Sequence, residues 1–186
     1  QVRLIPIQLP WGEQSDFKGV IDLINMKAFK GVGSEVVEIP QEFKDAADEA
    51  HLAIIEAAAE GEDSLMEKFF DEGSLTPEEI IKGLKAVMRT GSFVPVLVSS
   101  ASHQIGMIPL LDNILNLFPS PVESGPYQAT NKDGSEIELR TDDSGPLAAY
   151  VWKTTADPFV GKQTYFRVYS GVFSSDSKVW NQDKLI

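Results

Sequence analysis

The sequence predicts an α/β fold followed by a short β-rich segment. Two apolar runs, Val2–Leu9 and Phe93–Val98, have the β-branched composition of strands. Between them the pattern is mostly helical, with apolar side chains at three- and four-residue spacing. After Pro146 the pattern changes to strands separated by turns. We therefore expect the last part of an α/β domain that carries a mostly helical α+β insertion, and then an incomplete antiparallel β domain.

Composition restricts the class of protein. Of 186 residues, 42% are hydrophobic and 24% are charged, which is typical of a globular protein. No run reaches the roughly 18 apolar residues of a membrane span, and no secretory signal pattern opens the chain, so we expect no membrane partner. Cysteine is absent, which excludes disulfides and thiolate metal sites and fits a cytoplasmic protein.

The formal charge of −12 is concentrated in one segment. Glu35–Glu79 contains fifteen carboxylates and two lysines, whereas the rest of the chain is about neutral. Such a segment repels phosphate, so we expect it not to lie on nucleic acid, and we expect no DNA partner.

The first strands follow one another closely. Val2–Leu9 is predicted as a strand that ends at Pro10. Phe17–Phe29 and Glu35–Ile39 are predicted as strands joined through a turn at Gly31–Gly33. The insertion is therefore expected to contain strands as well as helices.

The acidic segment is predicted to contain three helices. The first is Gln41–Ala59, and a shorter one follows Gly61. The shorter helix is expected to turn its four large apolar side chains inward: Leu65, Met66, Phe69 and Phe70.

The third helix, Pro77–Arg89, has the clearest boundaries. Thr76 and Glu79 form a capping box, and proline occupies the first helical position. Gly91 follows the last turn, as is typical of helix ends.

A second strand, a loop and a helix follow. Phe93–Val98 is apolar without alternation, which suits a central strand covered on both faces in a parallel sheet. The small residues Ser99–Ala101 come next, and then a helix over Ile108–Phe118. Pro119–Pro121 stops this helix.

The end of the chain is predicted as a linker and strands. Residues 122–145 are rich in Gly, Ser, Asp and Asn and read as a linker with one hairpin. The strands and turns expected after it are Leu147–Thr154, Asp157–Gly161 (turn), Gln163–Tyr169, Ser174–Ser177 (turn) and Lys178–Trp180. Phe166 and Val168 alternate with Tyr165, Arg167 and Tyr169, which indicates one buried and one exposed face.

Motifs for hydrolysis or metal binding are missing from the sequence. It contains no GxxxxGK[ST] or GxGxxG loop, no HExxH, no zinc spacing and no EF-hand. Both histidines, His51 and His103, are expected to be structural. Asn131–Gly134 is similar to the guanine-reading NKxD motif, but Asp133 stands two positions after the asparagine instead of three, so a turn is predicted. We expect no catalytic residue and no metal ligand.

One loop stands where α/β sheets bind ligands. Val98–Ser102 lies at the carboxyl end of the second predicted strand. Its small side chains let backbone N–H groups approach a carbonyl oxygen closely, as recognition of guanine O6 requires. Small residues after a strand are also common without a ligand, so both interpretations stay open at this point.

Three blocks resemble elongation factor G, a family of translational GTPases. FVPVLVSSASHQIGMIPLLDNILNLFPSP is similar to the VPVLxGSA strand-loop and GxxPLLDxxxxxLPSP helix that end its GTPase domain. LIPIQLPWGEQSDFKGVIDLINMKAF is similar to PIQLPIGxxxxFxGVxDLxxMKA, the entry to its inserted subdomain. DPFVGKQTYFRVYSGVFSSDS is similar to DPFxGxLxFxRVYSGxLxxGD, the start of its second domain.

The resemblance implies a domain organisation. Residues 1–121 would be the end of a P-loop GTPase domain, including an inserted subdomain at about 12–91. Residues 122–145 would be a linker, and 146–186 the first strands of a β-barrel domain. The chain opens on Gln1 and stops soon after a strand, so we expect an internal fragment with both ends cut.

The resemblance also implies a binding site. Ser99, Ser100 and Ala101 would form the fifth guanine-nucleotide motif, with the Ala101 amide on guanine O6 and Ser100 shaping the loop. Ser99 stands where the family usually has glycine, which changes the backbone freedom of the loop. GTP and magnesium would bind in the parent protein through parts that precede Gln1, so the fragment itself is expected to bind neither and to be inactive.

The ribosome is the implied partner. The acidic insertion would contact the ribosomal stalk protein through Gln41–Ala59 and Pro77–Arg89. The β-barrel segment would contact small-subunit ribosomal RNA through Lys162, Arg167 and the Asp157–Gly161 loop. A solvated acidic face that only aids solubility is the alternative for the insertion.

Three functions follow from these observations. The first is a piece of a GTPase that drives ribosomal translocation and takes part in ribosome recycling. The second is a ribosomal protection paralogue of the tetracycline-resistance type, because Ser99 and Trp11 depart from the commonest elongation factor pattern. The third is a stand-alone acidic adaptor for a basic protein, against which the unfinished second domain weighs.

Overall fold

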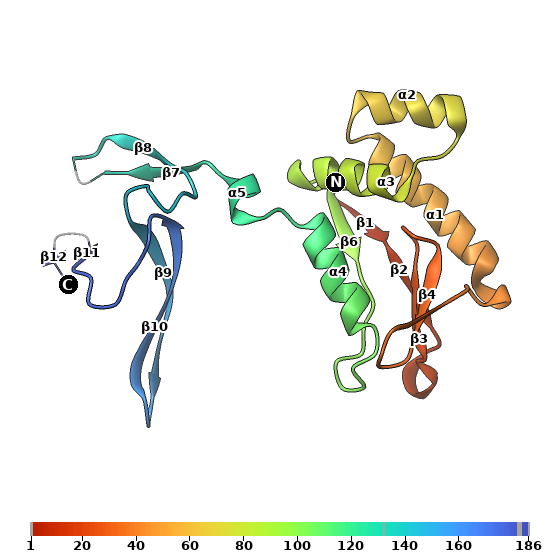
Figure 1. Cartoon of the computed structure of the whole chain (residues 1–186), viewed down its shortest axis with the longest axis horizontal. Helices are drawn as coiled ribbons and strands as arrows, with labels where there is room; N and C mark the ends of the chain where they lie inside the picture. The colour runs from red at the N-terminus through yellow and green to blue at the C-terminus, as the bar shows by residue number, and fades with distance from the viewer. Residues whose placement is uncertain (1, 132, 182–183, 186) are drawn as a thin grey trace. The chain divides into compact units, whose positions relative to one another are not determined.

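A computed structural model of the chain describes residues 2–131, 133–181 and 184–185. Gln1, Lys132, Gln182, Asp183 and Ile186, which fall within ranges predicted above, lie outside the described residues. The chain divides into two units, Gln1–Phe118 (unit 1) and Pro119–Ile186 (unit 2), and each is described by itself (Figure 1).

Unit 1 has a mixed α/β architecture (Figure 1). Its elements in chain order are β1 (Arg3–Pro6), β2 (Gln8–Trp11), η1 (Gln14–Asp16), β3 (Gly19–Asp22), β4 (Lys27–Lys30), β5 (Glu35–Val37), η2 (Gln41–Phe43), α1 (Lys44–Ala59), α2 (Asp63–Glu72), α3 (Pro77–Arg89), β6 (Phe93–Val96) and α4 (Met107–Leu117). Strands β2, β3, β4 and β5 form an antiparallel sheet in that order, and β1 pairs with β6 in parallel. The predicted parallel pairing of the Phe93 strand is therefore confirmed.

The core of unit 1 lies between the antiparallel sheet and the helices. The side chains of Ile21, Ile54, Ile80 and Leu84 are completely buried in it. Helices α1 and α3 approach so closely that a Cβ on Gly83 would meet the carbonyl oxygen of Ala58 at 2.1 Å. Only glycine fits at that contact, because any larger side chain would push the two helices apart.

The first predicted strands differ from the observed ones. Val2–Leu9 is not one strand, since β1 ends at Pro6 and β2 begins at Gln8 and runs through Pro10. Phe17–Phe29 is a hairpin, β3 and β4, instead of a single strand. The reason is the Asp22 carboxylate, which accepts the Ile24 and Asn25 N–H groups at 2.8 and 3.2 Å and turns the chain.

The predicted helices of the acidic segment are confirmed, with small changes. Gln41–Ala59 begins with the 3₁₀ turn η2 before α1, and Pro77–Arg89 is α3 with both hydrogen bonds of the capping box. Inward placement of Phe70 is wrong: its side chain is 77% exposed, because it lies on the face of α2 opposite the buried Leu65. Cover on both faces of β6 is also wrong for the described residues, since Val94 and Val96 are 44% and 37% exposed.

Unit 2 consists mainly of antiparallel strand pairs. Its elements are α5 (Pro121–Ser124), β7 (Tyr127–Thr130), β8 (Glu136–Leu139), β9 (Ala148–Asp157), β10 (Gly161–Ser170), β11 (Trp180–Asn181) and β12 (Lys184–Leu185). The pairs are β7 with β8, β9 with β10 and β11 with β12. The hairpin predicted within 122–145 is confirmed as β7–β8, and the two long predicted strands as β9 and β10.

The predicted buried face of β10 is wrong for the described residues. Phe166 and Val168 are 43% and 37% exposed, about as exposed as Tyr165 at 42%. The β9–β10 pair has two strands in the described part of the chain, and Phe173 is the aromatic ring that contacts Phe166, at 4.9 Å between centroids. Two strands cover too little area to bury either face.

Candidate functional site

The loop after β6 turns back on itself within a few residues. Ser100 and Ile105 form an isolated antiparallel bridge, with N–H to carbonyl distances of 2.9 and 3.1 Å. Inside the bridge the Gln104 N–H donates to the Ala101 carbonyl at 3.3 Å. The result is a closed loop, residues 98–106, at the carboxyl end of a parallel strand. Ser99, Ser100 and Ala101 lie together in it.

Gly106 closes the base of this loop and is the N-cap of α4. Its φ is +76°, a conformation that L side chains rarely adopt. A Cβ at this position would lie 2.9 Å from Val20 Cγ1 and 3.1 Å from the Val98 carbonyl oxygen. The loop can therefore reach α4 in this form only with glycine at its end.

A buried amide holds the other end of the loop. The Val98 N–H donates to Gln8 Oε1 at 3.0 Å, and Gln8 is only 1% exposed. Gln8 lies on β2, ninety positions earlier in the chain. Neither Gln8 nor Gly106 was predicted from the sequence as a site residue. The available signal for Gln8 is that it is the one polar residue in the otherwise apolar stretch Leu4–Leu9.

Hydroxyl groups inside the loop converge on one imidazole. Ser100 Oγ and Ser102 Oγ lie 3.1 and 3.2 Å from His103 Nδ1, and the side chain of His103 is exposed. His103 is itself a loop residue, and these contacts lie within the loop. His51 is half-buried on α1 and lies 2.6 Å through Nδ1 from the Leu23 carbonyl, which agrees with the structural role predicted for it.

The exposed side of the loop offers a backbone donor. In the part of the chain that the structure describes, the Ala101 N–H donates to no other group. Ser99 and Ala101 are exposed and carry small side chains. The loop therefore has, on an exposed residue, a backbone N–H that makes no hydrogen bond among the described residues and could donate to a carbonyl oxygen of a ligand.

The described residues of the NKxD-like segment, Asn131, Asp133 and Gly134, form a turn, as predicted. The Asn131 N–H donates to the Ser135 carbonyl at 2.8 Å, and the Gly134 N–H to the Asn131 carbonyl at 3.0 Å. Asp133 accepts the hydroxyl and the N–H of Ser135, and these two hydrogen bonds lower the pKa of its carboxyl group. The Asp133 carboxylate is engaged within its own turn and lies in unit 2.

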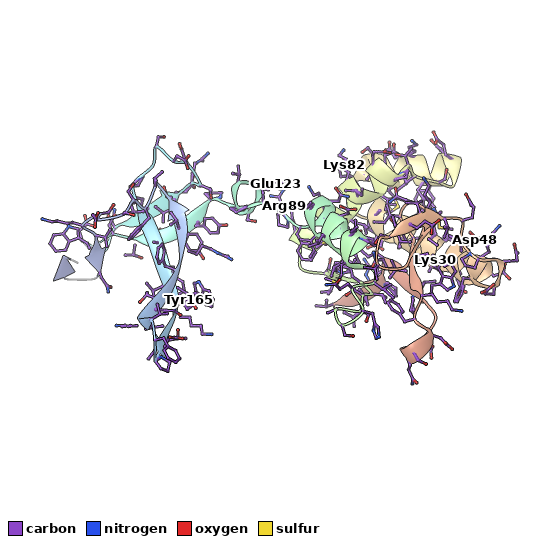
Figure 2. The ribbon with its side chains drawn as sticks, turned by 60° about the horizontal axis from the view of Figure 1, so that its bottom comes forward. Lys30, Asp48, Lys82, Arg89, Glu123 and Tyr165 are labelled. Carbon is purple, nitrogen blue, oxygen red and sulfur yellow. The ribbon has the colours of Figure 1, made fainter. Side chains whose placement is uncertain are left out.

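The acidic insertion exposes one face of α1. Asp48, Glu49 and Glu56 are exposed, and Leu52 lies among them with 46% of its side chain accessible. Positions 49, 52 and 56 share one side of the helix. Figure 2 shows the Asp48 side chain on the outside of unit 1. This face combines carboxylates with one apolar contact.

Ion pairs link the second and third helices of the insertion, α2 and α3. Lys68 Nζ lies 2.8 Å from Glu79 Oε1, and Lys82 Nζ lies 2.5 Å from Glu62 Oε2. The hydrogen bond from Lys68, and then the one from the Thr76 N–H, lower the pKa of Glu79. Each pair joins α3 to α2 or to Glu62, the residue just before α2.

In unit 2 the β9–β10 turn is held by Asp157. Its carboxylate accepts the N–H groups of Phe159 and Val160, both at 2.8 Å, and these bonds lower its pKa. Phe159 at the tip is 96% exposed. Lys162 and Arg167, the two predicted RNA contacts, are exposed on β10.

Neither a metal site nor a membrane span is found among the described residues. Within residues 2–131, 133–181 and 184–185, no group of three or more His, Asp or Glu side chains could hold a metal ion. Over the same ranges, every helix falls short of the length and apolarity needed to cross a bilayer.

Comparisons with known proteins identify what the chain is similar to. No protein-family model matches the sequence. Elongation factor G of Fervidobacterium nodosum is 42% identical over 185 residues, which is 97% of this chain and 27% of that protein. A crystal structure of a Thermus thermophilus protein matches with a TM-score of 0.69 and 31% identity, covering 90% of this chain and 23% of the other. The predicted resemblance to elongation factor G is thus confirmed, and the chain spans about a quarter of the length of the relatives it matches.

Proposed function

We propose that this chain, which resembles elongation factor G over 97% of its length, is part of a translational GTPase that drives ribosomal translocation with GTP hydrolysis. The 42% identity carries this proposal, because it extends through the loop, the insertion and the β segment. The mixed α/β fold shared with the Thermus protein supports it. The protein is expected to work in the cytoplasm, where ribosomes are.

In this function the 98–106 loop reads the guanine base. The Ala101 N–H donates to guanine O6, and this N–H has no other acceptor among the described residues, which supports that role. The Ser100–Ile105 bridge holds the backbone in place before the base arrives, which lowers the entropic cost of binding. Ser99 contributes a small exposed side chain that leaves room for the base.

The chemistry of hydrolysis requires groups that this chain does not contain. Magnesium and a phosphate loop neutralise the phosphates during phosphoryl transfer. The sequence has no GxxxxGK[ST] motif, so this chain would contribute only to base recognition. On its own the chain is expected to be inactive.

The acidic face of α1 is proposed as the stalk-protein contact. Glu49 and Glu56 flank the exposed Leu52, so a basic surface with an apolar pocket would complement it. Helix α1 packs closely against α3 where Ala58 meets Gly83, which favours a surface that is formed before binding.

The β9–β10 hairpin is proposed as the contact with small-subunit ribosomal RNA. Lys162 and Arg167 provide positive charge for phosphate groups. Phe159, held out by the Asp157 turn, provides an aromatic ring on which a base can stack.

A calorimetric titration tests the assignment of the missing parts. The chain is expected to give no heat of binding with GTP up to millimolar concentration, whereas a longer protein that includes the preceding residues binds it. Micromolar binding by the chain alone would refute the assignment. Two further assays separate the alternatives: rescue of translation from tetracycline indicates a protection paralogue, and a start codon directly before Gln1 indicates an adaptor.

A further inference from the structure

We propose that Gln8 is a positioning residue for the 98–106 loop, and that the sheet formed by β2, β3, β4 and β5 holds both ends of that loop. The inference rests on the proposed role of the loop in nucleotide binding, which it deepens. Gln8 itself touches no ligand in this role. It acts through the backbone of Val98.

The hydrogen bond from Val98 to Gln8 extends the pairing of β1 with β6 beyond the last hydrogen bond between their backbones. The parallel register of β1 and β6 ends at Pro6 with Val96, and the Ile7 N–H makes the last backbone bond to the Val96 carbonyl, at 3.0 Å. Beyond Ile7 the chain leaves β6 to form β2. The Gln8 side-chain oxygen then supplies the acceptor for the Val98 N–H, which would otherwise be unpaired at the start of the loop.

Burial of the Gln8 side-chain amide is unfavourable for folding, which indicates that the amide has a specific role. Gln8 Nε2 is buried, and among the described residues it has no hydrogen-bond partner. An unpaired buried donor is unfavourable, and an apolar side chain of similar size would fill this space without it. The Gln8 amide, unlike an apolar side chain, supplies an oxygen that accepts the Val98 N–H.

The two supports of the loop come from one face of one sheet. In the β2–β3 register Gln8 lies opposite Asp22, and Pro10 lies opposite Val20. Positions two apart along a strand share a face, so Gln8 and Val20 project to the same side. Gln8 holds the loop at Val98, and Val20 packs against Gly106 at its other end.

This arrangement connects the β2, β3, β4 and β5 sheet, and helix α1 that contacts it, to the loop. Strands β2 and β3 belong to the same sheet as β4 and β5, and His51 of α1 contacts the turn between β3 and β4 at the Leu23 carbonyl. Loop geometry therefore depends on a sheet that lies outside the β1–β6 pair. A site that must hold its donors within a fraction of an ångström gains from such support.

Amide hydrogen exchange on the chain as it stands tests the positioning role. In Gln8→Met, which keeps the length and removes the acceptor, the Val98, Ser100 and Ile105 amides are expected to exchange about three- to tenfold faster. The Ile80 and Leu84 amides of α3 are expected to keep their rates. Gln128→Met, an exposed glutamine of β7, is the matched control and should change neither group.

A measurement on the unsubstituted protein covers the case in which Gln8→Met does not fold. The Val98 amide should then exchange at least about tenfold more slowly than the Ala101 amide, which has no acceptor among the described residues. Equal rates for these two amides would overturn the inference. So would a uniform acceleration across all unit 1 amides in Gln8→Met, because that result indicates a general structural role.

A nucleotide measurement in the longer protein separates this inference from the proposed function. Gln8→Met is expected to weaken GDP binding there about three- to tenfold. Faster loop exchange with unchanged GDP affinity supports the positioning role and contradicts the nucleotide role of the loop. Unchanged loop exchange overturns the positioning role whatever the affinity.

Discussion

Gly106 lies against the Val98 backbone, so close that a Cβ on Gly106 would stand 3.1 Å from the Val98 carbonyl oxygen. Eight positions apart, these residues close the base of the loop that carries Ser99–Ala101. The contact allows α4 to begin directly after the loop.

Gly106→Ala is the first substitution to test. Alanine at φ +76° costs about 1–2 kcal/mol, and the close contacts with Val98 and Val20 add about 1–3 kcal/mol. We expect the free energy of unfolding of unit 1 to fall by about 2–5 kcal/mol, the sum of these two costs. Chemical unfolding followed by circular dichroism measures it.

Gly134→Ala is the matched control for that substitution. Gly134 has φ +84° in a turn with no atom within 4 Å of an added Cβ. It therefore reports the backbone cost alone, about 1–2 kcal/mol for unit 2. Equal losses for the two substitutions would show that the contact with Val98 contributes nothing.

Thr76→Ala removes the side-chain half of the α3 capping box. The Glu79 N–H then loses the Thr76 hydroxyl, at 3.3 Å, as its acceptor. We expect unit 1 to lose about 1 kcal/mol of unfolding free energy. Ser120→Ala removes the same box from α5, a four-residue helix without buried residues, and should leave unit 1 unchanged. A Thr76→Ala protein as stable as the unsubstituted one would contradict the capping role.

Glu79→Gln tests the ion pair with Lys68 through its pH dependence. The pKa of Glu79 lies below its ordinary value of 4.5, first because of Lys68 and then because of the Thr76 N–H. The stabilisation is therefore fully present above about pH 4.5 and is lost as the pH falls through the lowered pKa. An amide at position 79 can still accept from the Thr76 N–H, so the substitution removes the charge and keeps the cap.

The expected result is a smaller loss of unit 1 stability below pH 4.5 in Glu79→Gln. Denaturant midpoints measured from pH 7 to pH 3 provide the comparison. Glu78→Gln makes the same charge change next to it, at an exposed residue without an ion pair among the described residues, and should keep the original slope. Identical slopes for all three proteins would rule out the Lys68–Glu79 contribution.

Charge reversal on α1 tests the proposed stalk contact. Glu49→Lys with Glu56→Lys should weaken binding to a ribosomal stalk protein about tenfold at low salt, because both carboxylates face outward beside Leu52. Glu136→Lys with Asp143→Lys makes an equal charge change in unit 2 and should have little effect. An unchanged dissociation constant in the α1 variant at low salt would exclude this surface as the stalk contact.

Local signals explain which elements could be predicted from the sequence. The predicted bounds of the helix Pro77–Arg89 are confirmed at both ends. The signals that define them, the capping box at Thr76, Pro77 itself and Gly91, all lie within a few residues of a helix end. The β3–β4 turn was missed because Leu23 and Ile24 are apolar, and the Asp22 side chain that turns the chain looks like any strand-end carboxylate. Such a turn depends on side-chain geometry that hydrophobic periodicity does not report.

Long-range contacts explain what could not be predicted. The small residues Ser99–Ala101 mark the loop, but the Gln8 and Gly106 contacts that shape it depend on residues far apart or on a particular backbone angle. The exposure of Phe70 and Phe166 depends on which neighbours cover them, and composition carries no information on that. The sequence therefore identifies the loop, but it does not identify Gln8 and Gly106 as the residues that support it.

The Ala101 N–H is proposed to donate a hydrogen bond to guanine O6. One pair of substitutions tests the contribution of this N–H to nucleotide binding. Ala101→Pro removes this N–H, and Ala101→Gly keeps it. In the longer protein, Ala101→Pro should weaken GDP binding about three- to tenfold, and Ala101→Gly should not. The diphosphate nucleotide of 2-aminopurine, which lacks O6, should bind both variants and the unsubstituted protein equally. Equal weakening of both nucleotides by Ala101→Pro, or unchanged GDP binding, would contradict this role of the Ala101 N–H.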